Sequence, residues 1–286
     1  MIRLLVLAGV AALLLRGAGR KRKPQLVITS WLESELPSGW ARSAKRAGFD
    51  AVSKKVLHGS DPFRPGEAGR VLRAGDSAGL DRHGWGWHYL RDPLEAVEEG
   101  QAAGQMSRAL GLRAYWVNAE KHWAGVEGQP PTENPPRELQ IFADSFRSVA
   151  PRVLLIFNGF SWPRTSDGRP LLTPEALGAF DAFGPMVYGT TRATIAKKYR
   201  ARSKRASAVG VGFAPMVGTG RVDSLGRVWG FAESGPGGSG LLDLVREDPP
   251  DFLAFWYGAG SADMLTEGST ANPPLATVAR AIRART

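Results

Sequence analysis

The residues in this chain best suited to chemistry are polar side chains that follow short apolar runs. Glu120 lies two residues after Asn118 at the end of one run, and Tyr188 closes another. Trp116 and Trp123 flank Glu120, and burial beside such rings raises the pKa of a carboxyl group, so that Glu120 could stay protonated and act as a general acid. Side chains two residues apart on a strand point to the same side. We therefore expect Glu120, Asn118 and Tyr188 to form the catalytic part of an active site.

Seven further residues occupy similar positions, where a strand is expected to end. They are Trp31, His58, Asp61, Trp87, His88, Asn158 and Trp256. Sugars present apolar C–H faces and many hydroxyl groups, so flat aromatic rings beside hydrogen-bonding groups suit them. This composition predicts that the seven residues bind a polysaccharide.

Each prediction has an ordinary structural alternative, which the sequence leaves open. Glu120 could form a salt bridge with the adjacent Lys121 or with an arginine. Asn158 could only cap the following turn. Trp87 and Trp256 could simply pack over the end of the fold.

Other kinds of catalytic site have little support. The four histidines all fall near predicted strand ends, but they lack the His-x-His or His-Glu-x-x-His spacing of zinc sites. No Gly-x-Ser-x-Gly turn is present, and the absence of cysteine excludes disulfides and thiolate nucleophiles. We expect neither a metal nor another cofactor.

The elements that would position these residues alternate between strands and helices. The predicted strands cover 25–31, 49–57, 85–89, 113–119, 152–157, 182–188, 208–216 and 252–257. Most are continuously apolar, as in parallel strands buried on both faces. Eight repeats predict an α/β fold of the TIM-barrel type, a single (β/α)8 barrel, whose active sites lie at the carboxyl ends of the strands. An open doubly wound sheet is the alternative, but no Gly-x-Gly-x-x-Gly turn follows the first strand.

Proline-based signals mark where several helices begin. They are Asp92-Pro93, Asn134-Pro135, Thr173-Pro174 and Asn272-Pro273, each of which places a capping side chain before a proline at the first helical position. Two glycine-rich stretches, 59–84 and 218–240, show little periodicity. We expect both to be long loops on the functional face.

The first 23 residues form a separate segment, and residues 24–286 form the barrel. Residues 4–15 are an unbroken apolar run, followed by five basic residues within 16–23. The run is shorter than the roughly 20 residues that span a bilayer. Because the stronger positive charge follows it, we expect an uncleaved anchor that binds a membrane or a viral particle through residues 2–23. A signal peptide, and hence secretion, is the alternative, and an ordinary packed helix is a third.

The net charge of +10 is concentrated in two segments. Six basic residues precede residue 24, seven lie within 191–205, and neither segment contains an acid. The body of the chain is therefore not a basic nucleic-acid binder, and no specific nucleic-acid partner is expected. The second segment is either a solvated helix face or a contact for an anionic polymer or surface.

Residues 25–125 resemble the family-25 glycoside hydrolases, the lysozyme-like muramidases of bacteria and phages. The segments that carry the resemblance are Lys55-Val-Leu-His-Gly-Ser-Asp-Pro-Phe63, Trp87-His88-Tyr89 and Tyr115-Trp-Val-Asn-Ala-Glu120. Pro-Met-Val-Tyr188 and Trp256 are similar to features of the family-18 chitinase-like barrels. The resemblance implies a TIM barrel that hydrolyses peptidoglycan, with Glu120 as its acid.

Two departures weaken this implication. The family's aspartate near the end of its first strand has no counterpart, and its Asp-x-Glu is Asn118-Ala-Glu120 here. An Asn-x-Glu pair occurs in family-85 enzymes, where the substrate's acetamide attacks and the asparagine orients it. The resemblance thus implies a lysin-like hydrolase of an N-acetylhexosamine polymer, with substrate assistance as the mechanism that the Asn-x-Glu pair suggests. The alternative is an inactive barrel that binds cell walls or serves in virion assembly.

Overall fold

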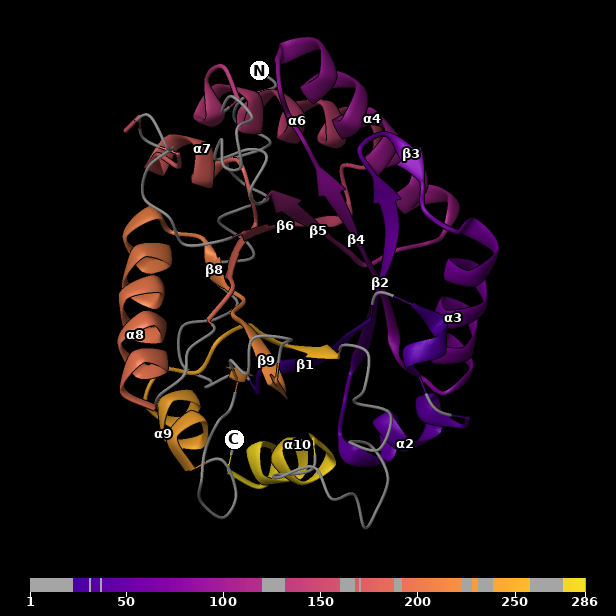
Figure 1. Cartoon of the computed structure of the whole chain (residues 1–286), viewed down its shortest axis with the longest axis vertical. Helices are drawn as coiled ribbons and strands as arrows, with labels where there is room; N and C mark the ends of the chain where they lie inside the picture. The colour runs from indigo at the N-terminus through magenta and orange to yellow at the C-terminus, as the bar shows by residue number, and fades with distance from the viewer. Residues whose placement is uncertain are drawn as a thin grey trace.

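Parallel strands form a closed ring in the computed structural model of this chain (Figure 1). The structure describes residues 23–30, 32–36, 38–119, 132–159, 168–169, 171–187, 192–222, 228–230, 239–257 and 275–285. Within these ranges the strands of the ring are β1 (Gln25–Ser30), β2 (Ala51–His58), β4 (Asp81–His88), β5 (Ala114–Ala119), β6 (Leu154–Gly159), β7 (Ala182–Pro185), β8 (Gly212–Phe213) with its continuation β9 (Met216–Val222), and β11 (Phe252–Tyr257).

The seam between the last strands closes the barrel. β7 pairs with β8, and β9 pairs in parallel with β11, which pairs with β1. At the interruption between β8 and β9, the Val187 amide donates to the Met216 carbonyl at 2.8 Å, and the Ala254 amide donates to the Pro215 carbonyl at 3.0 Å. β8 and β9 therefore act as one strand with neighbours on both sides, and the predicted eight-stranded barrel is confirmed.

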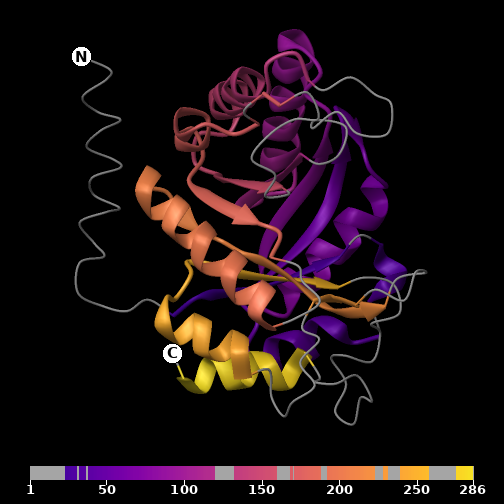
Figure 2. The ribbon, with the colours of Figure 1, turned by 60° about the vertical axis from the view of Figure 1, so that its left-hand side comes forward.

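Helices surround the ring, as Figures 1 and 2 show. They are η1 (Glu33–Glu35), α2 (Trp40–Ala47), α3 (Pro65–Ser77), α4 (Pro93–Ala109), α6 (Pro135–Val149), α7 (Pro174–Gly178), α8 (Arg192–Val209), α9 (Ser239–Glu247) and α10 (Leu275–Arg285). Their apolar faces and the outward sides of the strands form the larger core, which includes Phe142, Phe146 and Ile282. A smaller core, with Trp85, Trp116 and Ile156, fills the inside of the ring.

Three of the four predicted helix starts are correct, but their capping differs. The Asp92 carboxylate accepts from the Leu94 and Glu95 amides at 2.9 Å, and the Thr173 hydroxyl accepts from the Ala176 amide at 3.2 Å. The Asn134 side chain makes no capping bond. Instead the Glu138 carboxylate accepts from the Asn134 amide at 2.9 Å, as the acid of a capping box does, although Glu138 lies one position later in the helix. Asn272-Pro273 lies outside the described residues.

Both loop predictions for the glycine-rich stretches were wrong in part. Residues 59–84 contain the short strand β3 (Asp61–Pro62), helix α3 and the start of β4. A Cβ atom at Gly75 would lie 2.6 Å from Val52 Cγ1, so this glycine lets α3 pack closely on β2. Within 218–240, β9 continues to Val222 and pairs antiparallel with β10 (Val228–Gly230). Similarly, the seventh strand was predicted too early, because residues 208 and 209 still belong to α8.

A repeated aspartate fixes the amino-terminal end of the barrel, which we call the barrel bottom. Asp50, Asp181 and Asp251 each lie one residue before a strand. Their carboxylates accept from amides near the start of the preceding strand: Leu26 at 2.8 Å, Leu155 at 2.7 Å and Phe213 at 2.9 Å, respectively. Arg283 of α10 joins this end by donating to the Pro24 and Gly48 carbonyls, both at 2.9 Å, and by pairing with Asp50. The bottom is thus held by charge-assisted hydrogen bonds.

The hydrophobic segment predicted as an anchor lies, up to residue 22, outside the described residues. No helix in the described ranges is both long and apolar enough to cross a bilayer.

Candidate functional site

The carboxyl ends of the strands form the opposite end of the barrel, which we call the mouth. Strand alternation and register place Trp87 of β4, Asn118 of β5 and Asn158 of β6 at one level, facing inward. Trp256 of β11 also faces inward and packs edge-on against Trp85, with ring centroids 5.4 Å apart. The structure therefore brings four of the predicted site residues together at the mouth.

These four side chains differ in how much surface they expose. Asn118 and Asn158 are 3% and 2% exposed, whereas Trp87 and Trp256 are half-buried. The Asn158 amide nitrogen donates to the Gly184 carbonyl at 2.5 Å and lies 4.0 Å from Met216 Sδ, so Asn158 is held toward β7. The mouth thus combines partly open indole rings on β4 and β11 with recessed amides on β5 and β6.

Lys55 is a mouth residue that the sequence-based site omitted. Its ammonium lies 4.4 Å from the ring centroid of Phe63, 5.3 Å from that of Trp85 and 5.9 Å from that of Trp87. The adjacent Lys54 points the other way and pairs with Glu67 of α3 at 2.8 Å. The alternation Ala51, Ser53, Lys55 could have identified this inward residue, but two consecutive lysines obscured it.

His58 and Asp61 lie at the edge of the mouth, on the short β2–β3 hairpin. Both residues are exposed, and they are paired across the hairpin. His58 Nε2 lies 2.5 Å from the Tyr89 hydroxyl, and the two rings stack with centroids 5.5 Å apart. This pair provides a second aromatic surface beside Trp87, whose centroid is 6.5 Å from that of His58.

His88 does not face the mouth. It is fully buried on the outer side of β4, where Nδ1 lies 2.9 Å from the Glu99 carboxylate and Nε2 lies 2.9 Å from the Tyr115 hydroxyl. Because Trp87 points inward, its neighbour must point outward. The prediction that the His88 side chain contacts substrate does not fit this position, and His88 instead supports the strand that carries Trp87.

Glu99 of α4 organises this buried support. Besides the His88 contact, its carboxylate accepts from the Tyr89 amide at 3.2 Å. Burial, and then the charge of Glu99, raises the pKa of Tyr115 well above its ordinary value and also raises that of Tyr89. Both hydroxyl groups therefore stay protonated and able to donate. The network ties α4 to the two strands, β4 and β5, that supply Trp87 and Asn118.

His83 is also not a mouth residue, contrary to the expectation for all four histidines. β4 begins at Asp81 rather than at 85, and His83 lies low in the ring, packed against Trp116 and Phe252. Burial lowers the pKa of His83 to about 3, so the side chain is neutral near pH 7. No three His, Asp or Glu side chains in the described ranges lie close enough together to hold a metal ion.

Three predicted residues, Trp31, Glu120 and Tyr188, lie outside the described residues, as does His122. In the sequence, Trp31 directly follows β1 and Glu120 directly follows β5. At the mouth, the inward-facing side chains of the described ring strands include no carboxylate, and Lys55 carries the one formal charge among them. Asp61 lies at the exposed edge of the mouth, so an acid recessed among the strand ends has to come from residues beyond the described ring strands.

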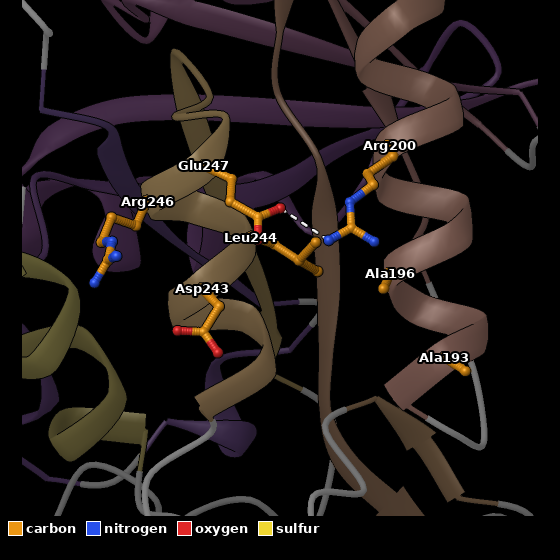
Figure 3. A pocket seen from close by; sticks show the side chains of 7 residues that line it. All are labelled: Ala193, Ala196, Arg200, Asp243, Leu244, Arg246 and Glu247. Atoms are coloured by element: carbon orange, nitrogen blue, oxygen red, sulfur yellow. Dashed lines mark hydrogen bonds and ion pairs between the residues drawn. The ribbon is translucent and has the colours of Figure 1, made fainter.

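One groove between described residues lies on the outer wall rather than at the mouth. It measures about 630 Å³ and lies between α8 and α9, as Figure 3 shows. Arg200 and Glu247 form an ion pair across it at 2.8 Å. This groove is separate from the aromatic and amide residues of the barrel mouth.

The sequence matches no known family profile and no curated protein. Among solved structures, the fold is similar to a chitinase from Bacteroides thetaiotaomicron, with a TM-score of 0.63, 11% identity and coverage of 91% of this chain and 96% of that one. A chitinase from Chromobacterium violaceum gives a TM-score of 0.59 at 9% identity, covering 90% of this chain and 98% of that one. A psychrophilic family-10 endo-β-1,4-xylanase gives a TM-score of 0.54 at 10% identity, covering 91% of this chain and 96% of that one.

At identities this low, the likeness concerns the backbone and not the chemistry. The three similar enzymes also differ in the polymer named for them, chitin in two and xylan in one. The resemblance to family 25 remains a prediction from the sequence. The chain has the eight-stranded (β/α) barrel fold of these glycoside hydrolases.

Proposed function

We propose that this protein is a glycoside hydrolase that acts on an N-acetylhexosamine polymer, either peptidoglycan or a chitin-like chain. The observation that carries the proposal is the mouth itself, where Trp87, Trp256, Asn118 and Asn158 converge from four strands. Active sites of this fold lie at this end. The two chitinase structures of similar fold add support.

Binding of a sugar chain follows from the chemistry of the mouth. The half-buried indoles of Trp87 and Trp256 offer apolar faces to the C–H surfaces of sugar rings. The recessed amides of Asn118 and Asn158 can exchange hydrogen bonds with an acetamide or a hydroxyl group. His58 and Asp61 at the edge, together with Trp31, would contact units of the chain further from the bond that is cut.

In the proposed reaction, Glu120 protonates the leaving glycosidic oxygen while the substrate's own acetamide oxygen attacks the anomeric carbon. The carbon–oxygen bond breaks as the new bond closes an oxazolinium ion, whose ring nitrogen keeps its proton. Asn118 orients the acetamide, and Tyr188 donates to the ring that forms. Glu120, now a carboxylate, then takes a proton from the water that attacks the same carbon and reopens the ring. One carboxyl group suffices here, which fits the absence of carboxylates among the inward-facing side chains of the described ring strands at the mouth.

The same absence favours a second candidate function, that of a barrel that binds a glycan without cutting it. A retaining glycosidase with two catalytic acids places them about 5 Å apart, and the inward faces of the described ring strands contribute neither at the mouth. In this case the aromatic and amide residues would hold a cell-wall polymer while the protein serves in attachment or in virion assembly.

For location, we propose a membrane-anchored or virion-associated protein, held through residues 2–23, with secretion as the alternative. Pro24 lies at the barrel bottom, where Arg283 binds its carbonyl at 2.9 Å. An anchor would therefore join the barrel at the end opposite the mouth. This arrangement would leave the mouth free to meet an extended polymer.

The direct test is release of reducing sugar from purified peptidoglycan and from chitin oligomers by the full chain. We expect Glu120→Gln to lower the rate at least about 100-fold, because it removes the general acid. Glu98→Gln, the same change on the exposed surface of α4, is the matched control and should leave the rate unchanged. An unchanged rate in Glu120→Gln would refute the proposed acid. No release by the native chain, with glycan binding retained, would select the binding barrel.

A further inference from the structure

Helix α8 lies on the outer wall of the barrel (Figure 2) and presents an unusual surface. Its inner face is fixed by Ile195, Tyr199 and Ala206, all buried. Tyr199 packs edge-on against Phe213, and its hydroxyl donates to the Asp248 carbonyl at 2.7 Å. These contacts determine which side of α8 faces outward.

The outward side of α8 is lined with cations. Lys197, Arg200 and Lys204 are exposed, and Lys198, Arg202 and Arg205 are half-buried along one flank. The helix contains no acidic residue, and the residues between the cations on its open side are small: Ala193, Ala201, Ser207 and Ala208. At 1.5 Å per residue, positions 197 to 205 extend over about 12 Å. The cations thus form a continuous strip rather than isolated charges.

The two edges of this strip are different. On the α9 side, Arg200 pairs with Glu247, with both side chains more than half exposed, and Asp243 lines the same groove (Figure 3). Exposed pairs of this kind contribute about 0–1 kcal/mol, so Arg200 can be shared with an incoming anion. On the α7 side, Arg205 donates to the Leu172 carbonyl, which holds that guanidinium in place.

The half-buried flank keeps like charges close together. Burial, and then the charge of Arg202, lowers the pKa of Lys198. Burial, and then the charge of Arg205, lowers the pKa of Arg202. These cations therefore repel one another in the folded protein, and a bound anion would reduce that repulsion.

The composition of the strip narrows the type of anion. Proteins that hold single-stranded nucleic acid stack bases on aromatic rings, but the one aromatic residue of α8, Tyr199, is buried. Helices that lie in a bilayer surface need large apolar residues beside their cations, and the strip has alanine and serine there. Arginine forks bind phosphate oxygens in pairs. These features fit a flexible phosphodiester polymer that carries neither bases nor acyl chains.

We propose that the strip of Lys197, Lys198, Arg200, Arg202, Lys204 and Arg205 on α8 binds a poly(polyol phosphate) chain along the outer wall of the barrel. The strip lies on a different surface from the mouth, so this binding does not depend on the mouth being catalytic. A polymer held there would keep the protein on a phosphate-bearing surface whether or not it cuts a glycan.

The test is the affinity of the full chain for synthetic poly(glycerol phosphate) at about 0.1 M salt, where charges separated by more than about 10 Å are screened. The double variant Lys197→Glu/Lys204→Glu should bind at least tenfold more weakly and show a smaller salt dependence. The control Arg42→Glu/Arg46→Glu on α2 makes the same change in net charge at two exposed arginines. It should lower the affinity for the polymer less than threefold. Glu247→Gln should bind more tightly than the native chain, because it releases Arg200.

Parallel titrations with single-stranded DNA, duplex DNA and phosphatidylglycerol vesicles complete the test. The proposal holds if the loss caused by the α8 variant is largest for poly(glycerol phosphate). It is overturned if the α2 variant loses as much as the α8 variant, or if the loss is larger for DNA or for vesicles. Lys197→Gln/Lys204→Gln guards against a folding defect, and it should give an intermediate loss with an unchanged melting temperature.

Discussion

The two ends of the barrel use different side chains for different purposes. At the bottom, Asp50, Asp181 and Asp251 bind strand amides, and Arg283 and Arg147 bind two of these carboxylates in turn. At the mouth, the described inward-facing side chains are indoles, amides and one lysine. The bottom satisfies its polar groups within the protein, whereas the mouth presents groups that suit a sugar chain.

This difference shows where changes should affect stability and where they should affect binding. The carboxylates of the bottom occupy hydrogen bonds that the backbone needs, so their loss should weaken the fold. The indoles of the mouth are only half-buried, so their removal should cost little stability. The buried network behind β4 combines both roles, because its polar groups are satisfied within the protein and it supports mouth residues from outside the ring.

The largest expected effect comes from this network. Glu99→Ala removes the carboxylate that accepts from the Tyr89 amide and contacts His88, and leaves these buried groups unsatisfied. We expect a loss of about 3 kcal/mol in the free energy of unfolding, measured by urea denaturation. Glu98→Ala, at the neighbouring exposed position, should change it by less than about 0.5 kcal/mol. Equal effects at the two positions would mean that the network does not support the fold.

A second prediction concerns pH and His83, which lies inside the ring. Because the pKa of His83 is lowered to about 3 in the folded protein, the unfolded chain binds a proton first as the pH falls below about 6.5. The contribution of neutral His83 to the free energy of unfolding is therefore complete above pH 6.5 and decreases toward pH 3. Between pH 7 and pH 5, the free energy of unfolding should fall by about 2 kcal/mol more in the native chain than in His83→Leu. Urea unfolding at each pH measures this difference. Parallel losses in the two proteins would contradict a buried, neutral His83.

The smallest expected effect on stability comes from single aspartates of the bottom. Asp251→Ala frees the Phe213 amide, and Asp181→Ala frees the Leu155 amide. Each should lower the free energy of unfolding by about 1–2 kcal/mol. Asp144→Ala, an exposed position on α6, should have almost no effect. If the Asp181 and Asp251 variants were as stable as this control, the aspartates would not act as clamps.

The sequence predicted the barrel well, because its buried parallel strands are continuous apolar runs and proline marks its helix starts. The sequence did not reveal α3 and the beginning of β4, because both segments contain glycine, which has a low propensity for helices and for strands. The reason for these glycines is tertiary, since a Cβ at Gly84 would lie 2.5 Å from Leu112 Cδ1 and one at Gly75 would clash with Val52. Such close approaches cannot be seen in a single sequence.

The candidate site was predicted less well than the fold. Choosing residues by their distance from a strand end combined both faces of β4, so His88 was grouped with Trp87 although they point in opposite directions. Counting alternation back from Trp87 would have placed His83 and Trp85 inside and His88 outside. The aspartates of the bottom also had a sequence signal, an acid one residue before a strand, as in Phe49-Asp50 and Phe180-Asp181.

The central claim, that the mouth binds a glycan, is tested most directly by calorimetric titration of the full chain with N-acetylglucosamine oligomers. Glu120→Gln is used as the background so that the ligand is not cut. On that background, Trp87→Ala and Asn118→Ala should each lower the affinity at least tenfold, whereas Asp251→Ala should leave it within about twofold despite its lower stability. Equal losses in the mouth and bottom variants, or no loss in the mouth variants, would contradict the assignment of the mouth as the glycan site.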